Sequence, residues 1–142
     1  MPSSETLHAS SVAIGDRAVL IEGASGAGKS DLALRLIDRG AVLISDDYTL
    51  LSRVGSTLLA SAPDTIAGQI EVRGLGIISL PHIDQVSVAL LVRLSDAPER
   101  MPSDGDKRSI AGIAIREVAI DSRSASAPIK VELALKHLAG AA

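Results

Sequence analysis

A glycine-rich stretch near the start of the chain has the residue types and spacing of a phosphate-binding loop. Residues 23–30 read GASGAGKS and satisfy the pattern G-x-x-x-x-G-K-[ST] in full. The glycines allow the backbone to wrap with its N–H groups pointing inward, and the N-terminus of a following helix adds partial positive charge. In this pattern the lysine reaches the outer phosphates and the serine ligates Mg²⁺.

The stretch therefore predicts a nucleotide or phosphate site, and a glycine-rich turn without a ligand is the alternative. Lys29 and Ser30 supply the side chains that would contact the phosphates and Mg²⁺. The cradle consists of Gly23, Ala24, Ser25, Gly26, Ala27 and Gly28.

Two adjacent carboxylates, Asp46 and Asp47, follow an apolar run at residues 41–45. A right-handed strand–helix–strand crossover brings the carboxyl ends of both strands to one edge of the sheet. Both acids should therefore lie beside the phosphate loop. One carboxylate there can join the shell of a metal, and the other can accept a proton from an attacking hydroxyl. A solvated turn or a helix cap is the alternative.

The elements that must position these groups follow from short apolar stretches between turn signals. Residues 29–39 place apolar side chains on one helical face, and Gly40 is suited to end that helix in a left-handed conformation. The expected strands cover 11–14, 18–22, 41–45, two runs either side of Gly55, a short run within 68–81 before a Gly-punctuated loop, 86–94, and one or two strands over 109–120. A loop is expected at 95–108 and a second helix at 126–140.

The composition suits a single domain and narrows the class of function. The chain has 142 residues, 46% of them hydrophobic, with no Phe, no Trp and one Tyr. Few aromatics, no basic tract and a net charge of −3 argue against DNA or RNA as a partner. The lack of Cys, of a signal pattern and of a membrane-length apolar run indicates a cytoplasmic protein.

Other polar residues have weaker patterns. Glu71 could be a second metal ligand or an ordinary strand end, and Arg73 follows it closely. His8 precedes the first expected strand, where a surface role is typical. Arg100 and Arg123 lie in polar segments, where either could neutralise phosphate charge in a transition state or be solvated.

Several separated stretches together resemble the catalytic domain of the bifunctional HPr kinase/phosphorylase family. They are His8, GASGAGKS at 23–30, RG at 39–40, LISDD at 43–47 and EVRGLGII at 71–78, in matching order and spacing. The resemblance covers nearly the whole chain. It implies an α/β P-loop fold of the phosphoenolpyruvate-carboxykinase-like type, with a mixed sheet and flanking helices. It also implies one catalytic domain over residues 1–142.

The resemblance further implies an activity. ATP with Mg²⁺ would phosphorylate a serine of HPr, the small phosphocarrier protein of the sugar phosphotransferase system. In the reverse reaction inorganic phosphate would remove that group and yield pyrophosphate. The family forms hexamers, so a homo-oligomer is expected, with no nucleic acid and no membrane as partner.

The roles of the family's residues can be carried over by position. Lys29 would hold the phosphates, with Ser30 and Glu71 as Mg²⁺ ligands. Asp47 looks like the base for phosphorylation and the acid for the reverse reaction, assisted by His8. The remaining matches are Asp46 in support of the metal or the site, Arg73, Gly74 and Gly76 within the segment important for both directions, Arg100 as the catalytic arginine, and Arg123 in the loop important for dephosphorylation.

The chain also departs from the family, and two other classes of function stay open. Family members are longer, carry a basic residue where Tyr48 stands, and have a Pro-rich, basic late loop that residues 118–128 lack. A small-metabolite kinase needs a lid with several arginines, whereas residues 95–108 hold only three basic side chains. A nucleotide-sensing module without catalysis would keep only the phosphate loop and a partner.

Overall fold

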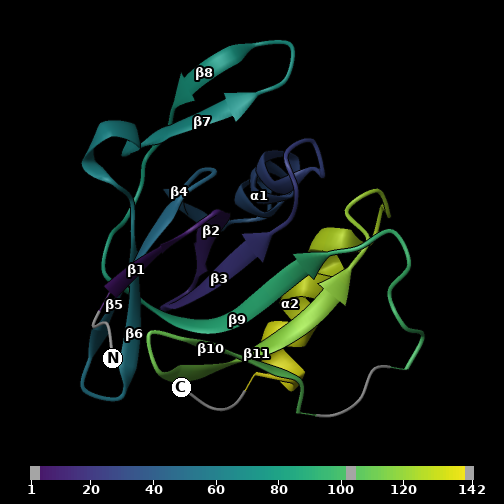
Figure 1. The fold of residues 1–142 in the computed structure, drawn as a ribbon. Helices are drawn as coiled ribbons and strands as arrows, with labels where there is room; N and C mark the ends of the chain where they lie inside the picture. Colours follow the sequence, from purple (N-terminus) through teal and green to yellow (C-terminus); the bar gives the residue numbers. More distant parts are fainter. Residues whose placement is uncertain (1–3, 102–104, 140–142) are drawn as a thin grey trace.

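A mixed nine-stranded sheet forms the body of the molecule, and two helices pack against one of its faces (Figure 1). This computed structural model describes residues 4–101 and 105–139. The strands of the large sheet are β1 (Ser4–Leu7), β2 (Ala9–Ile14), β3 (Arg17–Glu22), β4 (Val42–Ser45), β5 (Thr49–Val54), β6 (Thr57–Ser61), β9 (Val86–Leu94), β10 (Lys107–Ile110) and β11 (Ile113–Ile120). The remaining elements are α1 (Lys29–Asp38), the short 3-10 helix η1 (Asp64–Ile66), the hairpin strands β7 (Gln69–Val72) and β8 (Gly76–Ser79), and α2 (Ala127–His137).

The strand order explains how the two acids reach the phosphate loop. The sheet runs β1-β5-β6-β9-β3-β2-β4, with β11 parallel to β9 and β10 antiparallel to β11. Strand β2 pairs antiparallel with both β3 and β4, so β3 and β4 run in the same direction with β2 between them. The crossover through α1 therefore brings the carboxyl ends of β3 and β4 to one edge of the sheet, as predicted.

The core has two layers, one on each face of the sheet. Along β3, Val19 and Ile21 join the cluster that includes both helices, while Ala18 and Leu20 join the cluster under the outer strands. This alternation is the period of two that a strand imposes. Because β3 is covered on both faces, its residues 18–21 form an unbroken apolar run, as is typical of a buried central strand.

Helix α1 begins and ends at glycines with left-handed backbone conformations. Gly28, at the N-cap, has φ 100°, and Gly40, just past the end, has φ 110°. Leu32, Ala33 and Leu36 form its buried face. Since only glycine adopts such φ values without strain, both boundaries of this helix could be predicted from sequence.

The segment after Val72 differs from the sequence prediction. A loop was expected there, but residues 76–79 form β8 and pair back onto β7. Gly74 and Gly76 have φ of 88° and 96°, and Leu75 N donates to the Val72 carbonyl across 2.9 Å. These two positive φ values reverse the chain tightly enough for a hairpin.

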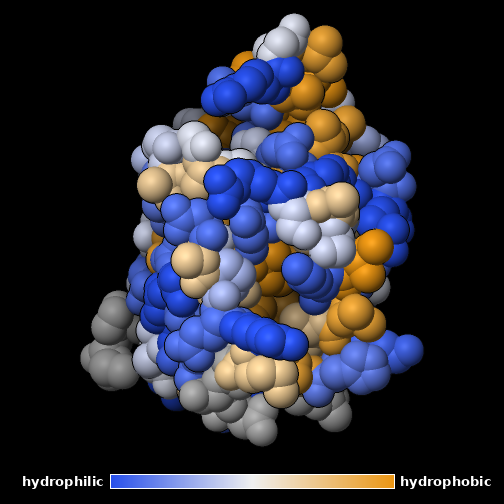
Figure 2. Space-filling model, turned by 90° about the vertical axis from the view of Figure 1, so that its right-hand side faces the viewer, coloured by the Kyte–Doolittle hydropathy of each residue, from blue (hydrophilic) through white to orange (hydrophobic). Residues whose placement is uncertain are grey.

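The hairpin β7–β8 projects beyond the sheet, at the top of Figure 1. Figure 2 shows hydrophobic side chains along one edge of this upper part of the molecule. Within the hairpin, Leu75 and Ile77 are both exposed.

The other predicted elements are confirmed with small shifts. The expected pairs around Gly15 and Gly55 are the hairpins β2–β3 and β5–β6, and residues 109–120 fall into two strands. Strand β1 was not predicted. Gly140, expected at the end of the second helix, lies outside the described residues. Within the described ranges, every helix is too short or too polar to cross a membrane.

Candidate active site

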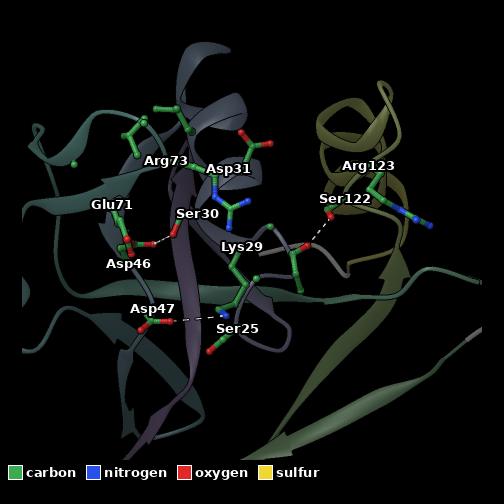
Figure 3. A pocket seen from close by; sticks show the side chains of 17 residues that line it. Ser25, Lys29, Ser30, Asp31, Asp46, Asp47, Glu71, Arg73, Ser122 and Arg123 are labelled. Carbon is green, nitrogen blue, oxygen red and sulfur yellow. Dashed lines mark hydrogen bonds and ion pairs between the residues drawn. The ribbon is translucent and has the colours of Figure 1, made fainter.

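An open pocket of about 710 Å³ lies at the edge of the sheet where β3 and β4 end. The phosphate loop, the first turns of α1, both predicted acids, the β7–β8 hairpin and the turn after β11 supply its walls. Figure 3 shows the polar side chains converging on this space from elements far apart in the sequence. Every predicted phosphate-loop residue from Ser25 to Ser30 lines it.

Lys29 is buried within the phosphate loop although it carries a charge. Its Nζ donates to the carbonyl oxygens of Gly23 at 2.9 Å and Ala24 at 3.3 Å, and lies 3.8 Å from Oδ1 of Asp47. A buried ammonium group requires such partners, because an unpaired charge away from water is costly. The ammonium is therefore held at the centre of the loop, facing the pocket.

The far wall of the loop is braced by the turn that follows β11. Ser122 Oγ donates to the Ala27 carbonyl at 2.7 Å. The guanidinium of Arg35 on α1 donates to the carbonyls of Ser122 and Ser124, which fastens that turn to the helix. A Cβ on Gly28 would lie 2.9 Å from Ser122 Oγ, so glycine is required here by contact as well as by φ.

Asp46 is buried and fully engaged by the protein. Its side chain accepts three hydrogen bonds: Oδ1 from the hydroxyls of Ser10 at 2.9 Å and Ser30 at 2.5 Å, and Oδ2 from the backbone N–H of Glu71 at 3.0 Å. Only 7% of the residue is exposed. Hydrogen bonds of this kind fix the orientation of the side chain.

Asp47 has the opposite environment, although it is the next residue. Its side chain is 53% exposed, and its backbone is left-handed with φ 68°. Oδ1 lies 2.8 Å from Nε2 of His8, whose ring stacks on Tyr48 with centroids 4.8 Å apart. Among the described residues Oδ2 has no hydrogen-bond partner. This oxygen is available to a group that enters the pocket.

The donor set near Ser30 suits a magnesium ion. Ser30 Oγ contacts the Asp46 carboxylate, and Figure 3 shows Glu71 beside them on the same wall. All of these donors are oxygens, which hard cations prefer, and Mg²⁺ typically binds through one or two carboxylates together with substrate phosphates. No group of three or more acidic, histidine or cysteine side chains that could hold a metal is found in the described part of the chain.

The predicted arginines and hairpin residues differ in their positions. Arg73, Gly74 and Gly76 line the pocket from the hairpin. Arg123 lines the opposite side and pairs with Asp121 at 3.1 Å. Hydrogen bonds from the Arg123 guanidinium and backbone N–H hold the pKa of the Asp121 carboxyl below its ordinary value. Arg100 is exposed on the loop after β9 and is not among the residues that line the pocket.

Three residues of the site were missed from sequence. Ser10 contacts both acids, Ser122 braces the phosphate loop, and Tyr48 supports the His8 ring. Serines are common everywhere, and only the pairing of β2 with β4 brings Ser10 to the acids. The position of Ser10 two residues after His8 in the sequence was the one available signal.

The comparisons with known proteins agree with this geometry. The family model described as HPr Serine kinase C-terminal domain matches residues 1–137. An HPr kinase/phosphorylase of Neisseria meningitidis serogroup C is 37% identical, and the match covers 96% of this chain and 47% of that protein. One of Alkaliphilus metalliredigens is 35% identical, with coverage of 84% and 43%. The chain thus spans less than half the length of these curated relatives.

A solved structure is also similar over almost its whole length. It is described as the Hpr(Ser) kinase/phosphatase from Coxiella burnetii, with a TM-score of 0.80 and 31% identity. The match covers 93% of this chain and 94% of the solved one. The expected phosphoenolpyruvate-carboxykinase-like P-loop fold is thereby confirmed.

Proposed function

This chain belongs to the HPr serine kinase family, and on that premise we propose that it transfers the γ-phosphoryl group of ATP to a serine of HPr. We further infer that it catalyses the reverse phosphorolysis and that residues 1–142 act as one catalytic domain. The proposal keeps the cytoplasmic location and the homo-oligomeric state expected from sequence.

One observation supports the proposal more than any other. A half-exposed carboxylate with a free oxygen, Asp47, lies 3.8 Å from the phosphate-loop lysine, Lys29. A phosphate held at that lysine would therefore lie beside a proton acceptor open to solvent. This combination suits a hydroxyl acceptor that must be deprotonated as it attacks.

In the proposed forward reaction the acceptor serine enters next to Asp47. Its oxygen forms a bond to the γ-phosphorus while the bond from that phosphorus to the β–γ bridging oxygen breaks, so ADP leaves. The serine proton passes to Oδ2 of Asp47. Lys29 holds the phosphates, His8 orients the Asp47 carboxylate through Oδ1, and catalysis comes mainly from position and charge.

In the proposed reverse reaction Asp47 acts as the acid. An oxygen of inorganic phosphate bonds to the phosphorus of phosphoserine, the bond to the serine oxygen breaks, and Asp47 returns the proton to that oxygen. The second product is pyrophosphate. Arg123 lines the pocket opposite the acids and is suited to hold the incoming phosphate.

Mg²⁺ would be held by Ser30 and Glu71, with Asp46 in support, and its charge would offset that of the phosphates. Asp46 keeps the Ser30 hydroxyl oriented, because that hydroxyl donates its proton to the carboxylate. We therefore assign support of the metal site to Asp46 and proton transfer to Asp47. Arg100 remains a predicted catalytic residue that would have to approach from its loop.

The proposal is tested by incubating the protein with Mg²⁺, γ-labelled ATP and purified HPr, and then adding phosphate. We expect label on a serine of HPr, followed by its release as pyrophosphate. HPr with alanine in place of the acceptor serine is the control. Label on a histidine of HPr, or no label at all, would contradict the proposal.

The same assay separates the two alternatives. A small-metabolite kinase would leave HPr unlabelled but label a compound in a chromatographic screen of metabolites. A sensing module would bind a partner in an ATP-dependent manner without consuming the nucleotide.

A further inference from the structure

We propose that Ser10 is a positioning residue whose hydroxyl holds both the side chain of Asp46 and the backbone of Asp47 in place. The inference rests on the proposed function for what Asp46 and Asp47 do, but the placement of Ser10 does not depend on it. Nothing in the phosphate-loop pattern or in the acid pair points to this serine. Its position beside the acids follows from the pairing of β2 with β4.

Strand β2 brings Ser10 to the acids. It runs antiparallel to β4, so its first residues lie beside the residues that follow the end of β4. Side chains alternate along a strand, and Val12 belongs to the cluster under the helices. Ser10, two residues before Val12, faces the same side, which is the side of Ser30 and the pocket.

The hydroxyl of Ser10 makes two contacts, and their directions are fixed. It accepts the backbone N–H of Asp47 at 3.0 Å and lies 2.9 Å from Oδ1 of Asp46. A serine hydroxyl has one proton to donate, and the backbone N–H of Asp47 can act only as a donor to it. The hydroxyl proton must therefore go to Oδ1 of Asp46, which accepts it.

This contact pair has a different consequence for each acid. On Asp46 it adds to the hydroxyl of Ser30 at the same oxygen, so the carboxylate cannot rotate away from Ser30. On Asp47 it anchors the backbone N–H of a residue in the left-handed conformation, with φ 68°, which few non-glycine residues adopt. That conformation aims the Asp47 side chain at His8 and Lys29.

Ser10 is completely buried, so water cannot replace its hydroxyl. Removal of the hydroxyl leaves the N–H of Asp47 without this acceptor and the Asp46 carboxylate without one donor. Hydrogen bonds to charged groups are among the stronger ones in proteins. The predicted defect is therefore local and concentrated on the two acids.

Ser11 provides a matched control on the same strand. It is equally buried, but it faces the other side of the sheet and bonds to the hydroxyl of Thr49 at 2.8 Å. Ser11→Ala thus removes one buried hydroxyl from the same strand without touching either acid. Any effect of strand loosening alone would be shared by both variants.

The test measures amide hydrogen exchange by NMR on nucleotide-free protein, together with the Mg²⁺ dependence of ATP binding. In Ser10→Ala we expect the Asp47 amide to exchange about two- to tenfold faster, the factor for the loss of one neutral hydrogen bond. Exchange of the β3 and β9 core amides should stay unchanged. The Mg²⁺ concentration for half-maximal ATP binding should rise about tenfold. Ser11→Ala should change neither quantity.

The inference is overturned if the Asp47 amide exchanges at the wild-type rate in Ser10→Ala, or if both variants change equally. Wild-type protein that binds no ATP in the presence of Mg²⁺ would refute the proposed function instead. The exchange measurement would still decide the placement of Ser10, because it uses neither nucleotide nor metal.

Discussion

Replacing Asp46 and Asp47 one at a time by asparagine should separate stability from catalysis. The two residues are neighbours in sequence and are both acidic, yet one is 7% exposed as a residue and the other has a side chain 53% exposed. Asparagine has nearly the same shape as aspartate, so differences between the variants report charge and hydrogen bonding. We expect Asp46→Asn to destabilise the fold and Asp47→Asn to slow phosphoryl transfer.

The magnitude for Asp46 follows from its three hydrogen bonds. An asparagine side chain offers one acceptor oxygen, so either the hydroxyls of Ser10 and Ser30 or the N–H of Glu71 must face its NH₂ group. A buried donor left unsatisfied costs about 1–3 kcal/mol. For a chain of this size 1 kcal/mol lowers Tm by about 2–4 °C, which gives a decrease of about 2–12 °C.

For Asp47 the expected effect is on the rate of phosphoryl transfer rather than on stability. Asparagine keeps an oxygen for His8 and tolerates the left-handed backbone, so the change in unfolding free energy should stay within about 0.5 kcal/mol. Loss of a positioned proton acceptor typically costs about 10²–10⁴ in rate. The expected result is a nearly unchanged Tm and a transfer rate reduced by that factor.

The assay combines thermal unfolding with single-turnover transfer from ATP to HPr at saturating Mg²⁺. Transfer at the wild-type rate by Asp47→Asn would refute the role of proton acceptor. A wild-type Tm in Asp46→Asn would refute the claim that its three bonds stabilise the fold. If the two patterns were exchanged, the roles of the acids would be reversed.

Three further predictions concern the walls of the pocket. Gly28→Ala should cost about 1–3 kcal/mol in backbone strain and weaken ATP binding, measured by calorimetry, because its Cβ would meet Ser122 Oγ at 2.9 Å with φ at 100°; undiminished affinity would contradict this. Lys29→Met should keep the fold, since the stem still packs, but lose transfer by at least about a hundredfold; a normal rate would remove the lysine from the mechanism. The pKa of Asp121 is lower in the folded protein than in the unfolded chain, so its pair with Arg123 stabilises the fold fully above the unfolded pKa. This stabilisation is lost as the pH falls through the folded pKa. An NMR titration of Asp121 should therefore give a pKa below that of a free aspartate.

Much of the site could be predicted from sequence because two strong local rules meet there. The phosphate loop is a matter of glycine conformations and spacing, and Gly28 has the left-handed backbone that its position in the motif requires. The position of the acids follows from the handedness of the β3–α1–β4 crossover. Neither rule depends on which strand lies between β3 and β4, so the prediction was correct although β2 is inserted there.

What sequence could not provide depends on pairing between distant segments. The strand β8 was read as a loop because two glycines in five residues are typical of loops, whereas here they build a tight hairpin turn. Ser122 reaches the phosphate loop only because β11 lies parallel to β9, which in turn lies parallel to β3. No periodicity or motif records a contact of this kind, in which residues 95 positions apart meet.

The two sides of the pocket are held in different ways, and this bears on which side can move. The acids are fixed by Ser10 from β2 of the large sheet and by the backbone N–H of Glu71 from the β7–β8 hairpin. On the other side, Arg123 extends from a turn that Arg35 fastens through backbone carbonyls, and among the described residues its exposed side chain pairs only with Asp121. An exposed ion pair of this kind contributes little stability and exchanges its partner easily. Proton transfer needs a fixed base, whereas capture of a phosphate can use an arginine that moves from one anion to another, so each group is held as firmly as its proposed task requires.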